Sequence, residues 1–97
     1  GKEASLRFTH LSPDSPAVNL SVKHADDVFQ NVAYGQTTEY LAVTPMTIDL
    51  ELRSPTDKDD VILPLPSITI QPGTPYTIYA VGKSGGDPAL EVILLSP

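Results

Sequence analysis

A histidine, a serine and an aspartate stand close together near the start of the chain, at His10, Ser12 and Asp14. These are the residue types of a hydrolase triad, in which the histidine must lie between the nucleophile and the acid. Here the serine is the middle residue, and side chains two positions apart on an extended chain start about 6.6 Å apart at Cα. Pro13 also bends the chain, so the spacing argues against a triad.

The same residues could form a binding site instead of a catalytic one. His10 and Asp14, with Ser12 and a tyrosine such as Tyr34 or Tyr40, could hold a small polar ligand or a metal ion. The simpler interpretation is that they tie a turn to the neighbouring backbone, because histidine and aspartate at corners commonly satisfy backbone groups. We favour that interpretation and keep the five residues as ligand-binding candidates.

Two further clusters have metal-binding residue types without the matching pattern. His24, Asp26 and Asp27 lack the spacing and ligand set of a zinc centre. The acidic run at 57–60 has neither the glycine nor the terminal glutamate of an EF-hand loop, and it contains Lys58. Both clusters are predicted to be solvated turns, and no metal or cofactor is expected.

Carbohydrate chemistry is suggested by tyrosines and by one asparagine. The four tyrosines could form a stacking platform, although tyrosines are routine in sandwich cores and no tryptophan supports this one. They are Tyr34, Tyr40, Tyr76 and Tyr79. Asn19 begins a glycosylation triplet with Leu20 and Ser21. Asn19 is more simply expected on the wet face of a strand.

Length and charge limit the classes of function. A chain of 97 residues supports one domain, 1–97, with a thin core. Its net charge of -6, with 12 acidic against 6 basic residues, argues against nucleic-acid binding. No stretch approaches the roughly 20 apolar residues of a membrane helix, so no transmembrane segment is expected. The absence of cysteine excludes disulfides and thiolate chemistry.

Short strands must position the candidate residues. Apolar and polar residues alternate in several runs, and the ten prolines fit many short strands better than helices. In the run at 17–23, Val18, Leu20 and Val22 should point inward, with Asn19, Ser21 and Lys23 in solvent. The expected strands lie at 5–10, 17–23, 46–53, 61–70, 76–81 and 89–95.

The segments between these strands are less regular. Residues 28–34 could form a short strand or an irregular crossing, and 37–43 could begin with a helical turn or stay extended. Residues 54–60 are expected to be a charged loop. Pro64 and Pro66 place the 61–70 strand on a sheet edge or break it. A turn at 72–73 should then close a hairpin.

The predicted fold is all-β: an antiparallel β-sandwich of about seven strands with little helix, of immunoglobulin-like or transthyretin-like architecture. Two N-terminal strands, an irregular crossing and a C-terminal four-strand meander would build it. The last strand, 89–95, is apolar on both faces. It is therefore either central in its sheet or in contact with something else.

Three parts of the sequence resemble the DUF4397 family of bacterial exported proteins: His10 to Val18, Tyr34-Gly35 with Tyr40-Leu41, and residues 72–82. The first motif usually ends in an aspartate where this chain has Asn19. A glycine usual before the middle strand is also missing, near Pro45. The resemblance covers nearly the whole chain. It implies a β-sandwich module, often present in tandem copies behind an export or lipoprotein signal, with no established activity.

These observations together predict a non-catalytic structural or interaction module of a secreted or cell-envelope bacterial protein. The resemblance implies an exported protein, whether periplasmic, lipoprotein-anchored or extracellular, and one module of a longer tandem chain. Another envelope protein, a glycan or a neighbouring copy of the module are the expected partners. The alternative is a small-ligand or metal-dependent binding protein, or an enzyme, with its site around His10 and Asp14.

Overall fold

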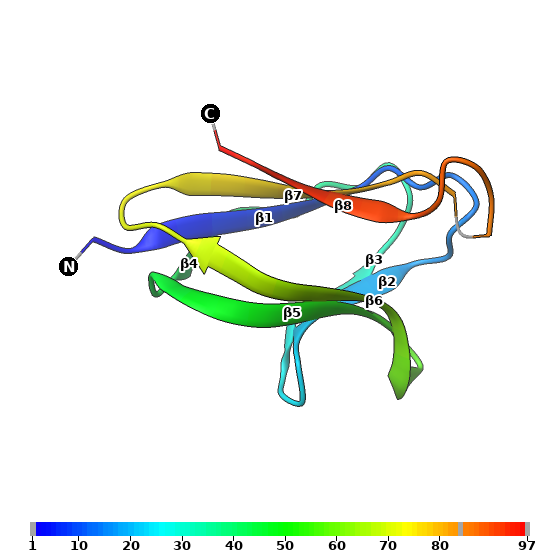
Figure 1. Ribbon diagram of the computed structural model, residues 1–97, viewed down its shortest axis with the longest axis horizontal. Helices are drawn as coiled ribbons and strands as arrows, with labels where there is room; N and C mark the ends of the chain where they lie inside the picture. The colour runs from blue at the N-terminus through cyan, green and yellow to red at the C-terminus, as the bar shows by residue number, and fades with distance from the viewer. Residues whose placement is uncertain (1, 84, 97) are drawn as a thin grey trace.

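The computed structural model describes residues 2–83 and 85–96, and these form an all-β sandwich of two four-stranded sheets (Figure 1). Within those residues there is no helix, and so none long and apolar enough to cross a membrane. The predicted all-β fold is confirmed. The strands are β1 (Ala4–His10), β2 (Val18–Val22), β3 (Asp27–Val32), β4 (Leu41–Val43), β5 (Met46–Ser54), β6 (Asp57–Ile70), β7 (Pro75–Val81) and β8 (Glu91–Leu95).

Strands from both ends of the chain share one sheet. Sheet A has the order β4-β1-β7-β8, and sheet B has the order β3-β2-β5-β6. Strands β1 and β7 are parallel, whereas every other pair of neighbouring strands is antiparallel. The predicted C-terminal meander is therefore wrong, because β5 and β6 belong to sheet B while β7 and β8 belong to sheet A.

The turn at 72–73 connects the two sheets. Gly73 has a φ of 66°, which fits the turn geometry expected of a glycine after proline. The predicted hairpin is wrong, since β7 leaves β6 and lies beside β1, where Leu6 is level with Tyr76 and Phe8 with Ile78. That register puts the apolar rows of β1 and β7 on the same face of sheet A. Alternation along one strand indicates which face is buried but not which strand lies beside it.

The core lies between the sheets and follows the predicted alternation. Phe8 and Ile78 face inward from sheet A, Leu20 and Leu52 face inward from sheet B, and all four are 0% exposed. Burying an apolar side chain of this size contributes about 1.5–3 kcal/mol. These four strands therefore hold the sandwich together and fix the ends from which the loops emerge.

The irregular segments have more strand than the sequence pattern predicted. Residues 27–32 form β3, and 41–43 form β4, which pairs with β1. The charged loop predicted at 54–60 shrinks to a turn at 55–56, because β6 already begins at Asp57. Strand β6 is an edge strand, as its prolines predicted, and it keeps pairing with β5 through register shifts.

Strand β8 is also an edge strand, in sheet A, on the side opposite β4. It closes sheet A beside β7 and is not a central strand. Val92 and Leu94 pack against the core, whereas Ile93 and Leu95 remain 39% and 53% exposed. Its apolar outer row is therefore uncovered in the part of the chain that the structure describes.

The solvent exposure predicted for β2 and its end is confirmed for Lys23 but is wrong for Asn19 and Ser21. Asn19 and Ser21 are buried on the outer side of sheet B, at 7% and 0% exposure. The Asn19 side-chain oxygen accepts a hydrogen bond of 2.7 Å from the backbone N–H of Asn31, and the Ser21 hydroxyl donates to Asp27. Strand β3 and its turn thus cover this face, which period-two alternation in β2 alone cannot show.

Candidate functional site

The polar corner between β1 and β2 is built by two prolines and by backbone hydrogen bonds. Strand β1 ends at His10, after which the Leu11 N–H donates to the Ala80 carbonyl at 2.8 Å. The Ser15 N–H then donates to the Ser12 carbonyl at 3.2 Å and closes a tight turn around Pro13. Proline fixes φ and cannot extend a ladder, so the chain leaves sheet A here and enters sheet B at β2.

Both ring nitrogens of His10 are used by the backbone of this corner. The ring is 1% exposed, and its Nδ1 accepts the Ser12 N–H at 3.2 Å. Its Nε2 lies 3.0 Å from the Pro16 carbonyl. A backbone N–H can only donate and a carbonyl can only accept, so these two partners specify the neutral tautomer with the proton on Nε2. His10 thus holds the turn through both of its polar atoms.

Ser12 and Asp14 do not complete a catalytic relay with this histidine. The Ser12 hydroxyl is directed to Asp14 Oδ1 at 3.5 Å, and it is the Ser12 main chain that meets the imidazole. A triad needs the serine hydroxyl on one imidazole nitrogen and the carboxylate on the other. The observed connectivity lacks both links, as the order of the residues predicted.

Tyr34 joins the corner from a distant part of the sequence. Its ring meets the His10 ring edge-on, with centroids 6.3 Å apart and planes at 85°. The Gly35 N–H donates to the His10 carbonyl at 2.8 Å, and the His10 N–H donates to the Gln36 carbonyl at 3.1 Å. The segment after β3 is thereby fastened to the end of β1, with the Tyr34 side chain 57% exposed.

Tyr40 lies apart from the corner, on the outer face of sheet A. The Arg7 guanidinium carbon sits 4.7 Å from the centre of its ring, a cation–π arrangement. Arg7 Nε donates to the Thr77 hydroxyl at 2.8 Å, which ties Tyr40 and β1 to β7. The structure thus brings together four of the five candidates, His10, Ser12, Asp14 and Tyr34, and separates the fifth.

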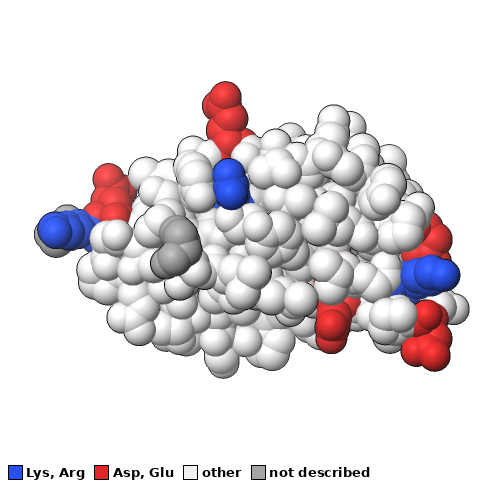
Figure 2. All heavy atoms as spheres, turned by 90° about the horizontal axis from the view of Figure 1, so that it is seen from above, with Lys and Arg blue, Asp and Glu red and all other residues white. Residues whose placement is uncertain are grey.

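The outer face of sheet A is a nearly uncharged platform. Figure 2 shows that uncharged atoms cover most of it, with one basic side chain near the middle and other charges along the rim and ends. The strand residues of this sheet include only two charged ones, Arg7 and Glu91. By register, the platform includes Arg7, Thr9, Tyr40, Thr77, Tyr79, Val81, Glu91, Ile93 and Leu95.

The four tyrosines therefore do not form one platform. Tyr40 and Tyr79 belong to the outer face of sheet A, while Tyr76 faces the core and its hydroxyl accepts the Gln71 N–H at 3.0 Å. Tyr34 is at the corner. The spacing of tyrosines along the sequence did not reveal this division, which follows from strand register.

The outer side of sheet B carries a polar cup that the sequence did not predict. The tips of the β2–β3 and β5–β6 hairpins project together on this side of the molecule (Figure 1). They enclose a hollow of about 730 Å³ above Glu51 and Arg53. The two clusters considered for metal binding meet here, since its walls include His24, Asp26, Asp27, Lys58 and Asp59.

Arg53 organises the floor of this cup. Its Nε donates to Glu51, its Nη1 to the Ala25 carbonyl at 2.9 Å and its Nη2 to the Val22 carbonyl at 2.7 Å. Asp27 lies 3.7 Å from Nη1. Charges buried to this extent persist when paired and hydrogen-bonded, as these are. Among the described residues, no group of three or more histidine or acidic side chains is arranged to hold a metal ion.

Comparison with known proteins adds a family and a fold. The family model described as "Domain of unknown function (DUF4397)" matches residues 4–96. The C-terminal domain of AlgF from P. aeruginosa has a similar structure, with a TM-score of 0.71 at 19% sequence identity and complete coverage of both chains. No curated protein matches the sequence. At this level of identity, the likeness to the solved structure shows a shared fold.

Proposed function

The chain belongs to the DUF4397 family, and from that premise we propose that it is a non-catalytic interaction module of an exported bacterial protein. One observation carries the proposal: the edge strand β8 presents exposed Ile93 and Leu95 beside a nearly uncharged sheet face. Exposed apolar residues gathered in one place are a common mark of interaction sites. The likeness to the C-terminal domain of AlgF is consistent with a module that accompanies other domains.

The corner supports a non-catalytic role. Because both nitrogens of His10 are engaged by backbone groups, neither can act as a general base without dismantling the turn. Asp14 is exposed, yet it approaches Ser12 and not the imidazole. We therefore assign His10 and Ser12 to holding the turn.

Strand β8 differs from the other three sheet edges. Natural edges are commonly blunted by short strands, bulges, prolines or charges. Strand β4 has three residues, β3 carries register shifts and the positive φ of Asn31, and β6 contains Pro64 and Pro66. By contrast, β8 pairs with β7 in unbroken register over five residues, with a single charge at Glu91.

A neighbouring copy of the module fits this edge. If two β8 strands pair antiparallel about Ile93, each Ile93 meets its counterpart and each Glu91 faces Leu95 of the other copy. Like charges are then not opposite one another, and the apolar outer rows form one surface. Addition of a strand to an exposed edge is a recurrent mode of recognition, with main-chain hydrogen bonds supplying affinity. We infer that the module associates with other copies through β8.

Sedimentation velocity over a range of protein concentrations tests this association. We expect the chain to self-associate, and the double variant Ile93→Thr/Leu95→Thr to remain monomeric at concentrations at which the native chain pairs. Val61→Thr is the matched control, because Val61 is an exposed residue on the β6 edge of the other sheet. A native chain that stays monomeric throughout, or a double variant that still pairs, would contradict the proposal.

The role of the corner has its own test. His10→Ala removes two hydrogen bonds and leaves the N–H of buried Ser12 without its partner, so we expect a loss of about 2–3 kcal/mol in the free energy of unfolding. His24→Asn is the control, since His24 is exposed and its φ of 60° is one that asparagine tolerates. Unchanged stability of His10→Ala in urea unfolding would argue for a functional and not a structural role.

A further inference from the structure

The sandwich is open along one side, where an apolar groove runs between the two sheets. Its volume is about 340 Å³, within the range of roughly 300–1,000 Å³ typical of small-molecule sites. One wall comes from β1 and β4 of sheet A, and the other from β2, β3 and β5 of sheet B. The walls include Leu6, Leu41, Val43, Val22, Val28 and Ile48.

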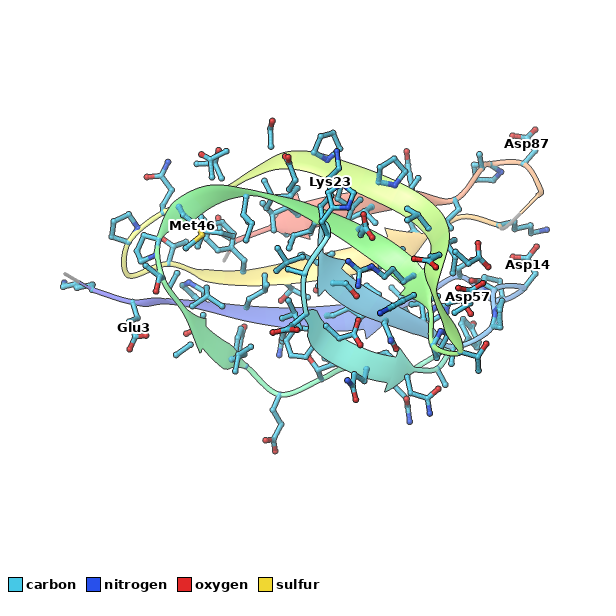
Figure 3. The ribbon with its side chains drawn as sticks, turned by 90° about the horizontal axis from the view of Figure 1, so that it is seen from below. Glu3, Asp14, Lys23, Met46, Asp57 and Asp87 are labelled. Carbon is cyan, nitrogen blue, oxygen red and sulfur yellow. The ribbon has the colours of Figure 1, made fainter. Side chains whose placement is uncertain are left out.

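This groove is distinct from the polar corner. Figure 3 shows Met46, which lines the groove, toward the end of the molecule that carries Glu3, whereas Asp14 lies at the opposite end. Leu41 and Met46 are 43% and 45% exposed, so the opening reaches solvent. A ligand could therefore enter without disturbing the contacts of His10.

Two carboxylates interrupt the apolar lining. Among the described residues that line the groove, Asp26 and Asp27 are the charged ones and Thr44 is the other polar one. Asp27 is already engaged, since it accepts hydrogen bonds from Ser21 and Gln30 and lies near Arg53. In contrast, Asp26 is exposed, and no salt bridge reaches it from the residues that the structure describes.

The position of Asp26 gives the groove a charge preference. Both aspartates also line the polar cup, so the apolar groove and the cup meet at this pair. An apolar chain in the groove would be stabilised by removal of its surface from water. A positive group at the end of that chain would gain further by lying beside the Asp26 carboxylate, whereas a negative group would be repelled.

We propose that the groove binds an amphipathic amine: an alkyl chain lies between the sheets, and its ammonium group lies at Asp26. The apolar walls supply most of the affinity, and the carboxylate supplies the selection for a cation. This site is independent of β8. The groove lies at the β4 edge of sheet A, and β8 forms the opposite edge, with β1 and β7 between them. Failure of one proposal leaves the other standing.

Three probes of equal chain length separate the two contributions. Octylamine, octanol and octanoate are titrated into the ¹⁵N-labelled protein, and amide shifts of Val28, Leu41 and Ile48 report on the groove. We expect octylamine to bind about 1.5- to fivefold more tightly than octanol, the range set by an exposed ion pair. Octanoate should bind most weakly of the three.

Two variants test the assignment of the residues. Asp26→Asn should make octylamine bind no better than octanol while leaving octanol unchanged. Leu41→Ser should weaken all three probes, whereas Leu95→Ser, an exposed leucine on β8, should weaken none. Equal binding of the three probes, retention of the amine preference by Asp26→Asn, or no shift at the groove with any probe at millimolar concentration would overturn the proposal.

Discussion

The outer faces of the two sheets differ in which side chains they expose and which they bury. Sheet A leaves apolar residues such as Leu95 in solvent, whereas sheet B buries charged residues such as Arg53 and Glu51. The cause is local architecture. The hairpin tips of sheet B fold over its outer side, whereas the segment of Thr37 and Tyr40 covers only part of β1 on the outer side of sheet A. Residue type therefore predicts whether a side chain is exposed or buried only when it is known which other segments of the chain pack on that face of the sheet.

The two outer faces are expected to serve different purposes, stability for sheet B and association for sheet A. The charges of sheet B are satisfied within the chain by Arg53, which joins Glu51 to the backbone of the β2–β3 turn. The apolar residues of sheet A have no such internal partner at their outer side. We therefore expect substitutions on sheet B to change stability, and substitutions on sheet A to change association.

The largest effect is expected for Arg53→Ala. The substitution leaves Glu51 buried without its partner and removes the hydrogen bonds from Arg53 to the Val22 and Ala25 carbonyls. Breaking a buried pair from one side typically costs about 3–5 kcal/mol. Urea unfolding followed by circular dichroism would measure the loss, and a change below about 1 kcal/mol, the usual upper range for a surface pair, would show that the network contributes little.

A double variant sharpens the same point. Glu51→Leu/Arg53→Met removes both charges, and replacement of buried pairs by apolar residues of similar size is often close to neutral. The two hydrogen bonds from Arg53 to backbone carbonyls are still lost, at about 1 kcal/mol each. We therefore expect the double variant to recover about half of the loss seen in Arg53→Ala. A double variant less stable than Arg53→Ala would contradict this account.

Arg7 provides the counterpart on sheet A. Arg7→Met removes the hydrogen bond to Thr77 and the contact with the Tyr40 ring. Each is worth about 0.5–1.5 kcal/mol at a partly exposed position, and methionine keeps the apolar stem. We expect a loss of about 1–2 kcal/mol in the same unfolding experiment. A loss as large as that of Arg53→Ala would erase the contrast between the faces.

The smallest effect on stability is expected for Leu95→Thr. The side chain is 53% exposed and threonine favours strands, so the free energy of unfolding should change by less than about 0.5 kcal/mol. The measurement must be made at low concentration, where the chain is monomeric. A destabilisation that grows with protein concentration would show instead that this residue stabilises the paired form, in agreement with the role proposed for β8.

Local alternation predicted the core well and the pairing of strands poorly. Val18 and Leu20 were correctly placed inward because a period of two depends on near neighbours alone. The burial of Ser21 depends on Asp27 and on Arg53 from another strand, and the exchange of strands between sheets depends on the register of β7 with β1. Such distant contacts leave no signature in the spacing of neighbouring residues.

The candidate site was predicted in the same partial way. The two prolines and the end of the first strand indicated a corner, and His10 is there with backbone partners. The sequence did not distinguish Tyr34 from Tyr40 as candidates for the corner. In the structure, Tyr34 lies against His10 and Tyr40 against Arg7. Only the path of the chain between β3 and β4 separates them. The polar cup combines two hairpins and had no single motif that could reveal it.

The parallel pairing of β1 with β7 has a consequence for how the chain folds. Sheet B is assembled from antiparallel strands between residues 18 and 70, whereas sheet A cannot close until Tyr76 and its neighbours reach a strand formed near residue 6. Closing so long a loop carries an entropic cost before any contact repays it, and slows folding. During synthesis, sheet B can form once Ile70 has been made, and its apolar face stays open until β7 and β8 follow. Docking of β7 and β8, in the last twenty or so residues, is therefore the step that completes folding of the domain.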